Sequence, residues 1–278
     1  MTLRLLNTVQ GLERCAELQK SVWGGANDAL GGPDMVALVH AGGMAAGAFE
    51  GDELAGFVFG FPSYLPDAPR PNGLHSHLLA VLPEYRGHGL GKALKWFQRD
   101  WCLARGLAWM TWTFDPLQAK NARLNLEHLG AVVEQYRVDE YGAMGGALAG
   151  TLPTDRLLAF WEMEAPRTLA LAQGLDPATL VLTASALKAS SLTTLPTVLT
   201  DQSGRPAAPD TTRTELRLRV EIPADFTELL HRDPDTALAW RLAAREVLKA
   251  YLDKGYVITR FLEETYLLEA KRQLNLRI

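Results

Sequence analysis

The chain has 278 residues, of which 47% are hydrophobic and 22% charged, and this composition excludes a chain dominated by disorder. The formal net charge of −4 excludes a strongly basic protein, so we expect no nucleic-acid partner. No run approaches the ~18 uninterrupted apolar residues of a membrane span, and Met1–Leu6 is too short for a signal peptide. We therefore expect a cytoplasmic protein that does not contact a membrane.

The first 165 residues alternate between patterns that are typical of strands and of helices. In chain order we first expect a strand over 3–8, a helix over 10–23, a loop over 24–34, and hairpin strands over 45–49 and 54–61. A second helix could open at Pro33 within that first loop. There follow a surface loop over 62–73, a strand over 74–81, a helix over 89–104, a strand over 107–114, a helix over 117–129, and strands over 131–138 and 157–163. The helix over 89–104 places apolar residues near one face, namely Leu90, Leu94, Phe97, Trp101 and Leu103. This order predicts a mixed α/β domain.

Pro166 and the segment 173–177 suggest a domain boundary, so we expect one domain over 1–165 and a second over 166–278. The second region predicts strands over 180–183, 195–199, 216–222, 256–261 and 265–268, a loop over 201–210 and a helix over 236–252. Its order of helix, glycine and strand over 239–262 repeats that over 90–114, which suggests a degenerate half copy of the first domain. Because no glycine loop precedes this second helix, we expect no cofactor site there.

Two cysteines, Cys15 and Cys102, lie in stretches with helical periodicity, and we interpret both as small buried hydrophobic residues. They are too few for a disulfide framework or a cysteine-rich zinc site. The low count fits a reducing compartment, and we expect no bound metal.

A glycine-rich loop joins a predicted strand to a predicted helix, with the sequence Arg86-Gly87-His88-Gly89-Leu90-Gly91-Lys92. Unpaired amides at a helix N-terminus and glycines that admit a close approach together form a phosphate site. A P-loop is excluded because Arg86 stands five residues before Gly91 and Ala93 follows Lys92. A dinucleotide loop is excluded because Lys92 and Leu94 occupy the positions of its third glycine.

The remaining pattern, Arg/Gln-x-x-Gly-x-Gly/Ala, is matched by Arg86, Gly89 and Gly91, and it resembles the pyrophosphate loop of the GNAT superfamily of acyl-CoA-dependent N-acyltransferases. The likeness spans roughly residues 1–165. It is closer to an uncharacterised branch of predicted acyltransferases with a C-terminal extension. The stretches that carry it are His75-Ser76-His77, Trp112-Thr113-Phe114-Asp115-Pro116 and Asn121-Ala122-Arg123-Leu124-Asn125.

The resemblance implies an α/β (α+β) fold with a mixed, mostly antiparallel sheet flanked by helices, followed by a smaller α+β domain. It also implies that the backbone of Leu79 and Val81 pairs with the pantetheine arm of acyl-CoA, while the amides of residues 87–92 hold the pyrophosphate. Lys92 either adds charge or is a solvated helix residue. The positions assigned to acyl-CoA in this way are Leu79, Ala80, Val81, Arg86, Gly87, His88, Gly89, Leu90, Gly91, Lys92, Asn121 and Asn125.

An amine attacks a thioester only when neutral, so a base or a water relay must remove a proton. Many family members place a carboxylate five residues before the alanine of the pantetheine strand. Here that alanine is Ala80 and the matching residue is His75, with His77 two residues further on. A period of two places both histidines and Leu79 on one face, where the thioester would lie. Neutral imidazole is a suitable base near pH 7. Either histidine could act, or both could be hydrogen-bonded inside the sheet.

A backbone N–H near Leu79 is expected to polarise the thioester carbonyl, as the resemblance implies. Many relatives also carry a tyrosine, as general acid, four residues before the glycine that ends the next helix. Gly130 ends that helix here and the position holds Leu126, so this chain departs from the pattern. Asn121 or Asn125 would contact the pantetheine or the sulfur instead. Tyr136 and Tyr141 are possible acids that the spacing does not select, and an unassisted thiolate is a further alternative.

Two other groups are interpreted structurally. Trp109, Trp112 and Phe114 are expected in the core of the sheet rather than against a substrate. Asp155 and Arg156 precede a strand, and we favour a surface pair over a contact with an acceptor carboxylate.

The leading hypothesis is an acyl-CoA-dependent N-acyltransferase that acts by direct attack in a ternary complex. The acceptor would be the amine of a small molecule such as an amino acid, and the acyl group acetyl or larger, such as succinyl. Acyl-CoA is the co-substrate and no metal is needed. The chain could also form a homodimer. The alternatives are a protein or peptide N-acetyltransferase, and a non-catalytic acyl-CoA sensor whose second domain recruits a partner.

Overall fold

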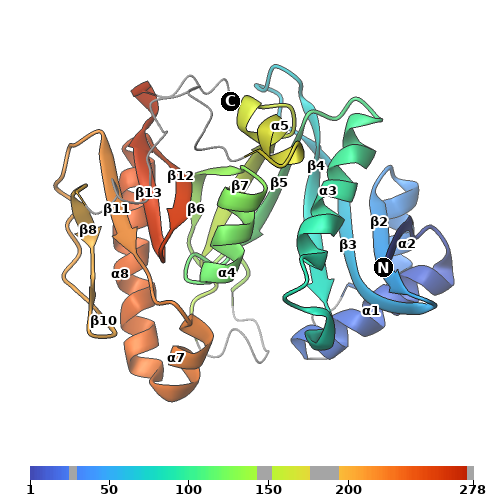
Figure 1. The fold of residues 1–278 in the computed structure, drawn as a ribbon, viewed down its shortest axis with the longest axis horizontal. Helices are drawn as coiled ribbons and strands as arrows, with labels where there is room; N and C mark the ends of the chain where they lie inside the picture. Colours follow the sequence, from blue (N-terminus) through green and yellow to red (C-terminus); the bar gives the residue numbers. More distant parts are fainter. Residues whose placement is uncertain (25–29, 143–151, 176–193, 274–278) are drawn as a thin grey trace. The chain divides into compact units, whose positions relative to one another are not determined.

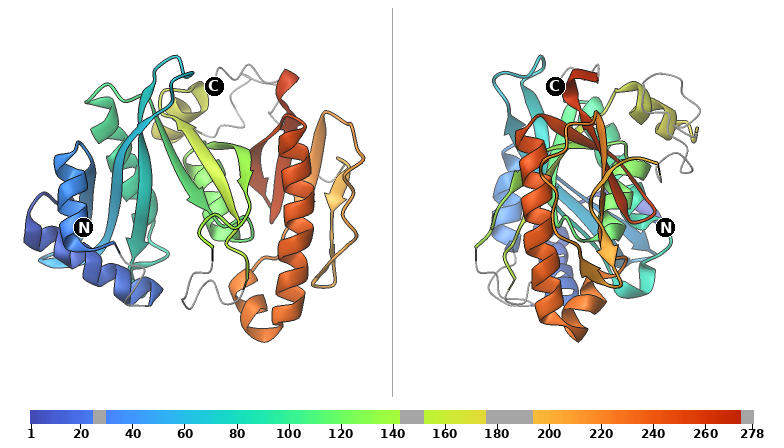
Figure 2. Two further views of the ribbon diagram at one scale, coloured as in Figure 1. Left: turned by 180° about the vertical axis from the view of Figure 1, so that it is seen from behind. Right: turned by 90° about the vertical axis from the view of Figure 1, so that its left-hand side faces the viewer.

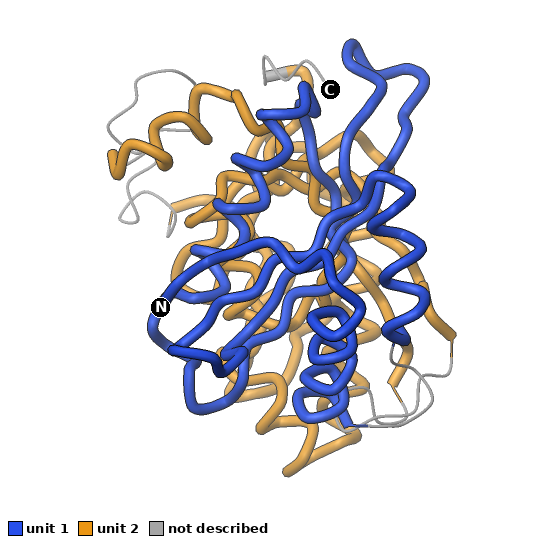
Figure 3. The backbone as a smooth tube through the Cα atoms, turned by 90° about the vertical axis from the view of Figure 1, so that its right-hand side faces the viewer, with its two compact units in different colours: residues 1–112, 144–150 blue, residues 113–143, 151–278 orange. Residues whose placement is uncertain are grey.

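The computed structural model describes residues 1–24, 30–142, 152–175 and 194–273 (Figure 1). These residues form two compact units (Figure 3). Unit 1 holds the described residues of 1–112, and unit 2 holds those of 113–142 and 152–273. This division does not coincide with the boundary expected after residue 165, and the two-domain assignment stays a prediction. The strand expected over 180–183 lies outside the described residues.

Unit 1 is a sheet with helices packed on both of its faces. Its elements are β1 (Thr2–Leu5), α1 (Val9–Trp23), α2 (Gly32–His40), β2 (Met44–Glu50), β3 (Glu53–Tyr64), β4 (Asn72–Val81), α3 (Leu90–Leu103) and β5 (Trp109–Phe114), whose last two residues belong to unit 2. The strand order is β1-β2-β3-β4-β5, antiparallel except for the parallel pair of β4 with β5. The mixed, mostly antiparallel fold is therefore confirmed for this unit.

The two faces of the unit 1 sheet can be told apart from neighbouring residues of β2. Ala45 packs in a core cluster with residues of α1 and α2. The side chain of Met44, one residue earlier, meets Gln98 of α3, whose Nε2 lies 3.4 Å from the sulfur. Because successive residues of a strand point to opposite faces, α1 and α2 cover one face and α3 covers the other.

Unit 2 contains a run of mostly antiparallel strands and a long helix. Its main elements are α4 (Ala119–Ala122), a π-helical turn η2 (Arg123–His128), β6 (Val132–Arg137), β7 (Arg156–Glu162), α5 (Pro166–Ala172), β8 (Thr197–Leu199), β11 (Arg217–Glu221), α7 (Phe226–Arg232), α8 (Pro234–Asp253), β12 (Tyr256–Leu262) and β13 (Thr265–Ala270). The strand order is β7-β6-β12-β13-β11-β8, antiparallel except for the parallel pair of β11 with β8. Figure 2 shows α8 running along this unit.

Several boundaries differ from the sequence-based expectations. The loop expected over 62–73 is shorter, because β3 continues to Tyr64 and β4 already begins at Asn72. The helix expected over 117–129 starts late and changes to π-helical geometry at Arg123. The loop expected over 201–210 contains a small hairpin of β9 (Asp201–Gln202) with β10 (Arg205–Pro206). The seven-residue helices α5 and α7 were not predicted, since they are too short for a clear helical period.

The buried face of α3 is also rotated from its prediction. Leu90 and Leu94 are buried as expected, but Phe97, Trp101 and Leu103 are only half-buried. The other buried residues of the helix are Lys95, Gln98, Arg99 and Cys102. The periodicity missed this face because polar residues occupy part of it. The two cysteines are confirmed as buried free thiols, and burial raises the pKa of each to about 12.

Candidate functional site

The glycine loop adopts the backbone that an anion site requires. Gly87 has a φ of 84° and Gly89 a φ of 75°, both in the left-handed region that favours glycine. Gly89 is the N-cap of α3, so the cap residue has no side chain that could accept a hydrogen bond from the first turn. The first amides of this 14-residue helix therefore lack an intrahelical partner and lie at the positive end of the helix dipole. Together with the exposure of residues 86–89, this geometry suits a phosphate group.

Two residues before the glycines fix the loop to strands β2, β3 and β4 of the same unit. The Tyr85 hydroxyl donates to the carboxylates of Glu50 (2.9 Å) and Glu53 (3.2 Å) at the β2–β3 turn. Hydrogen bonding to Glu50 is the main reason why the pKa of Tyr85 rises to about 12. Arg86 Nε donates to the carbonyl of Val81 at the end of β4 (3.0 Å). Sequence reasoning assigned Arg86 but missed Tyr85, because its partners lie more than 30 residues away in the chain.

A β-bulge in β4 changes the face assignment that the sequence predicted. Gly60 of β3 pairs with Ser76 and Phe59 pairs with Leu78, so His77 has no partner on β3. Residues before the bulge keep the expected alternation, but those after it are shifted by one position. The prediction that Leu79 shares the face of His75 is therefore wrong.

The side chain of Leu79 instead points toward α3. Its Cδ2 would lie 3.7 Å from a Cβ built on Gly91, in ordinary van der Waals contact. Leu78 and Ala80 pack on the opposite face, with the cluster formed by α1 and α2. The backbone of Leu79, Ala80 and Val81 lies between this cluster and the glycine loop, and its pairing with pantetheine stays a prediction.

The two histidines lie together on the face that α1 and α2 cover. The His75 and His77 ring centroids are 6.0 Å apart, and both rings contact Phe61, at 5.3 and 5.5 Å. Their expected common face is confirmed, and the bulge places Leu78 rather than Leu79 beside them.

The chemical setting of the two histidines differs. His75 is half-buried, and its Nδ1 lies 3.1 Å from the Thr111 hydroxyl of β5. If Nδ1 carries the hydrogen and donates to Thr111, Nε2 retains the lone pair that a general base needs. His77 reaches solvent, yet desolvation of its ring lowers the pKa of His77. Its neutral form is thus favoured near pH 7.

The remaining residues assigned to acyl-CoA lie at the helix start and in unit 2. Lys92 is exposed on the first turn of α3, and His88 is exposed in the loop. Asn121 is exposed on α4, whereas Asn125 is buried in the π-helical turn. π-helical turns occur frequently at functional sites. The roles of both asparagines stay predictions.

The residues considered as alternatives are engaged elsewhere in unit 2. The Tyr136 hydroxyl donates to Asp155 (2.6 Å), and the Tyr141 hydroxyl lies 2.7 Å from that of Thr113. Leu126 is fully buried. Asp155 is also fully buried and accepts two hydrogen bonds from Arg245 (2.8 and 2.7 Å), so its expected place in a surface pair is wrong.

The three aromatic residues of β5 are buried, which agrees with the core interpretation. Trp109 is 3% exposed, Trp112 6% and Phe114 5%. Trp109 also explains why residue 73 is glycine, since a Cβ there would lie 2.3 Å from the indole ring.

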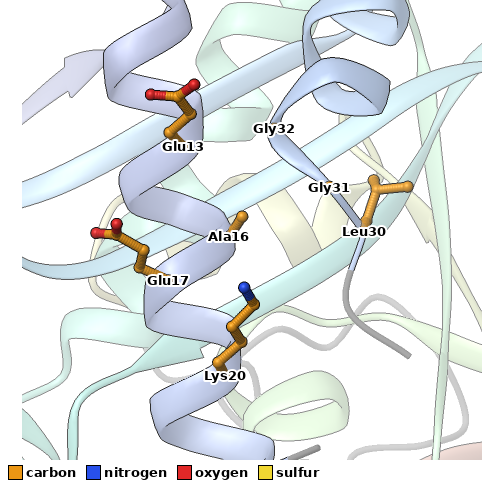
Figure 4. Close-up of a pocket in the computed structure, with 7 residues that line it drawn as sticks. All are labelled: Glu13, Ala16, Glu17, Lys20, Leu30, Gly31 and Gly32. Carbon is orange, nitrogen blue, oxygen red and sulfur yellow. The ribbon is translucent and has the colours of Figure 1, made fainter. Parts of the chain in front are cut away.

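A shallow hollow of about 380 Å³ lies between α1 and α2, as Figure 4 shows. Its wall carries Glu13, Glu17 and Lys20 from α1. Gln19 fixes the segment that precedes α2 by exchanging hydrogen bonds with the backbone of Leu30 (3.1 and 3.2 Å). None of the predicted site residues lines this hollow, so we do not place the candidate site there.

Within the described ranges, no group of three or more histidine, cysteine, aspartate or glutamate side chains could hold a metal ion. In the same ranges, every helix is too short or too polar to cross a membrane.

Residues 13–130 match the sequence model of the acetyltransferase (GNAT) family. This stretch holds the glycine loop, the bulged strand β4 and the parallel pair of β4 with β5. The chain therefore contains a GNAT acetyltransferase domain. Acyl transfer from CoA to an amine is the reaction of this family, with acetyl-CoA as co-substrate. No curated protein sequence matches the chain significantly.

Three of the solved structures with similarity to this chain are described below. The ribosomal-protein-S18-alanine N-acetyltransferase of Escherichia coli has 18% identity and a TM-score of 0.46, with 58% of this chain and 92% of that chain covered. An aminoglycoside 6'-acetyltransferase type Ii has 17% identity and a TM-score of 0.46, with coverage of 59% and 97%. An Arabidopsis thaliana protein solved with the bisubstrate analogue CoA-Ac-MVNAL has 15% identity and a TM-score of 0.46, with coverage of 58% and 98%.

Proposed function

We propose that this protein transfers an acyl group from acyl-CoA to the amine of a small molecule by direct attack in a ternary complex. The observation that carries the proposal is the loop at residues 86–91, whose left-handed glycines open α3 without a side-chain cap. A diphosphate is a natural ligand for such a helix start. The match of residues 13–130 to the GNAT family supports CoA as the carrier of that diphosphate.

On this proposal, the amides of residues 87–92 bind the pyrophosphate and Lys92 adds a positive charge at its edge. The backbone of Leu79, Ala80 and Val81 aligns the pantetheine arm as an added strand. A main-chain N–H at this part of β4 stabilises the oxyanion that forms on the thioester carbonyl. The bulge at His77 is where the backbone of β4 departs from regular pairing with β3, so unpaired main-chain groups are expected there.

His75 or His77 removes the proton from the attacking amine, directly or through water. His75 has the better-defined orientation, because Thr111 is positioned to accept from Nδ1. Once the base has taken the proton, the amine nitrogen attacks the thioester carbon and the C–S bond breaks. The CoA thiolate then leaves while the attacking nitrogen releases its second proton, and this proton reaches the thiolate directly or through water.

The substitution His88→Asp tests the anion site with little effect on folding. His88 is exposed in the loop, so the free energy of unfolding of the free protein should change by no more than about 0.5 kcal/mol. The added carboxylate would stand beside the pyrophosphate and repel it, and we expect acetyl-CoA affinity to fall about 10-fold or more. Calorimetric titration with acetyl-CoA and a thermal melt measure the two effects. Unchanged affinity would remove the loop from the site.

His75→Ala and His77→Ala test the base. Substitution of the histidine that acts as the base should lower kcat at pH 7 about 10²-fold or more, while the Kd of acetyl-CoA stays nearly constant. If His77 is the base, its lowered pKa predicts that the acidic fall in kcat/KM of the wild type has its midpoint below pH 6.5. Full turnover in both variants would exclude an imidazole base.

A further inference from the structure

Helix α3 of unit 1 carries a buried amine whose hydrogen-bond partners are weak. Lys95 is 2% exposed, and its Nζ lies 3.6 Å from the sulfur of Met110 and 3.5 Å from the centroid of the Trp112 ring. A thioether sulfur is a weak acceptor, and contact with a ring face is also weak, whereas a lysine amine carries several N–H donors. Among the described residues, no carboxylate forms an ion pair with this amine. Lys95 therefore retains donor capacity that a ligand can use.

The contacts of α3 place this amine level with the bulge of β4. At the start of the helix, a Cβ built on Gly91 would lie 3.7 Å from the side chain of Leu79. Two turns further on, Gln98 Nε2 lies 3.0 Å from a Cβ built on Gly60 of β3, and Gly60 pairs with Ser76 of β4. The two contacts agree, because seven helical residues advance about 10 Å and three strand residues span about 10 Å. The buried lysine stands one turn beyond the first contact, which is the level of the bulge.

The amine also lies where the pairing of β4 with β5 ends. Within the described residues, these parallel strands pair at Leu74 with Met110 and at His75 with Thr111. Trp112 is the next residue of β5, so the amine contacts the last pair and the first position beyond it. The rest of β4, up to the glycine loop, is therefore not paired with β5, and an extended ligand can add to such a strand edge. All of these groups belong to unit 1.

We propose that Lys95 is a catalytic residue whose amine donates a hydrogen bond to the sulfur of acyl-CoA and stabilises the thiolate as the C–S bond breaks. This inference rests on the proposed function, in which the pyrophosphate lies at the start of α3 and the pantetheine arm runs along β4 toward the bulge. The thioester stands at the inner end of that arm and so reaches the level of Lys95. The electron pair of the C–S bond passes to sulfur, the second proton of the attacking nitrogen reaches it, and Lys95 begins and ends the step in the same protonation state.

The electrostatic setting of Lys95 suits this role. Burial lowers the pKa of Lys95, and a neutral amine keeps N–H donors without requiring a carboxylate beside it. Cys102 also acts on Lys95 electrostatically, but burial raises the pKa of Cys102 to about 12, so it remains a thiol near pH 7. A buried amine with weak partners costs stability, and such a cost is more readily understood at a functional site than in a core.

The first experiment measures the acidity of the CoA thiol on the full-length chain, without turnover. The ultraviolet absorbance of the thiolate is titrated with CoA bound. The two cysteines of the protein do not interfere, because burial raises the pKa of Cys15 and that of Cys102 to about 12. Removal of the N–H donor in Lys95→Met should raise the pKa of the bound thiol by about one unit or more relative to the wild type.

A matched control makes the same change at an exposed lysine of the same unit. Lys20→Met on α1 should leave the pKa of the bound CoA thiol at its wild-type value. An equal thiol pKa in Lys95→Met and the wild type would overturn the proposal.

A second measurement uses the wild type alone and does not depend on the folding of a variant. Calorimetric titration compares CoA with desulfo-CoA, which lacks only the sulfur. A donor at the sulfur lowers the pKa of the bound thiol below its ordinary value of about 8.5. The affinity for CoA relative to desulfo-CoA should then rise with pH between the bound and the free pKa, by up to about 10-fold per pH unit. A ratio that stays constant or falls would contradict a donor at this position.

Transfer kinetics test the catalytic role. Lys95→Met should lower kcat for acetyl transfer about 10-fold or more while KM for acetyl-CoA stays nearly constant, because a thioester sulfur accepts weakly and a thiolate strongly. The melting temperature of Lys95→Met should not fall, which separates a lost contact from a damaged fold.

The outcomes distinguish this inference from the proposed function. A bound-thiol pKa that depends on Lys95, with no acyl transfer to any amine, would retain the contact with sulfur and contradict the proposed function. Acyl transfer whose kcat is the same in Lys95→Met and the wild type would retain the function and contradict the role of Lys95.

Discussion

The two compact units bury cationic side chains in opposite ways. In unit 1, Lys95 of α3 is 2% exposed, and its Nζ faces the sulfur of Met110 (3.6 Å) and the ring of Trp112 (3.5 Å to the centroid). In unit 2, Arg241 of α8 is also 2% exposed but meets Asp115 through two hydrogen bonds (2.8 and 2.6 Å).

The difference follows from the chemistry of the two groups. Desolvation lowers the pKa of Lys95 well below its ordinary value, so this amine can lose its proton and remain buried without a counterion. A guanidinium does not lose its proton in proteins, so Arg241 must be paired. Burial opposes the charge of Arg241, but Asp115 outweighs it, and the net pKa is raised. Burial therefore disfavours the charged form of Lys95, whereas a carboxylate keeps the buried Arg241 charged.

The largest expected effect on stability comes from removing Asp115, the carboxylate that pairs with the buried Arg241. Asp115→Ala leaves the Arg241 guanidinium buried without a carboxylate and should lower the free energy of unfolding by about 3–5 kcal/mol. Asp253→Ala removes an exposed partner of Lys249 on the same helix as Arg241 and should cost at most about 0.5 kcal/mol. Urea unfolding of both variants measures the contrast. The double variant Asp115→Ala/Arg241→Met should recover part of the loss, and failure to do so would show that Asp115 acts mainly through its bond to the Leu117 amide.

A smaller effect on stability, of opposite sign, is expected when the buried amine of Lys95 is removed. Lys95→Met keeps the side-chain length and removes a buried amine, so the free energy of unfolding at pH 7 should rise by about 1–3 kcal/mol. Lys92→Met changes an exposed lysine of the same helix and should stay within about 0.5 kcal/mol of the wild type. Thermal and urea unfolding provide the measurement. A destabilised Lys95→Met would mean that the contact of the amine with Trp112 outweighs its desolvation.

The pH dependence sharpens the same contrast, with an expected slope of at most about 1.4 kcal/mol per pH unit. The folded pKa of Lys95 is lowered, so between that pKa and 10.5 the unfolded chain binds the extra proton. Wild-type stability should therefore rise relative to Lys95→Met as pH increases from 7 toward 10, and the gap between the two should close. A constant gap would indicate that Lys95 stays charged in the fold.

Asp155 of unit 2 should show a pH dependence of the same sign, but at acidic pH. Burial raises the pKa of Asp155, but hydrogen bonds from Arg245 and Tyr136 outweigh it, and the net pKa is lowered. Its stabilising contribution is thus present above pH 3.8 and lost as pH falls through the folded pKa. The stability difference between the wild type and Asp155→Asn should shrink on acidification from pH 5 to pH 2. An unchanged difference would assign the effect to packing rather than to charge.

Local pattern predicted most of the elements. The spacing of Leu12, Cys15 and Leu18 predicted α1, and the acid-glycine turn at 50–53 predicted the hairpin of β2 with β3. The glycine loop is recognisable in the sequence, because its pattern specifies both a backbone requirement at Gly89 and the start of a helix. Such features depend on residues a few positions apart, which is the range that periodicity and turn chemistry describe.

Features that depend on pairing between distant segments were missed or misassigned. The bulge at His77 depends on the register of β3 against β4, and it moved Leu79 to the opposite face. Asp155 looked like a surface residue because its partner Arg245 lies 90 residues further along the chain.

By itself, the sequence determined the order of strands and helices in the N-terminal region, the glycine loop at residues 86–91 that opens a helix, and the family that this loop resembles. These follow from backbone freedom and apolar period, which each short segment carries on its own. Only the tertiary structure decided which face each histidine and Leu79 occupies, and that Lys95 is buried against a sulfur and an indole ring. Burial and charge pairing are properties of the assembled sheet and helices, because the free energy of a charge depends on which distant groups desolvate or pair with it.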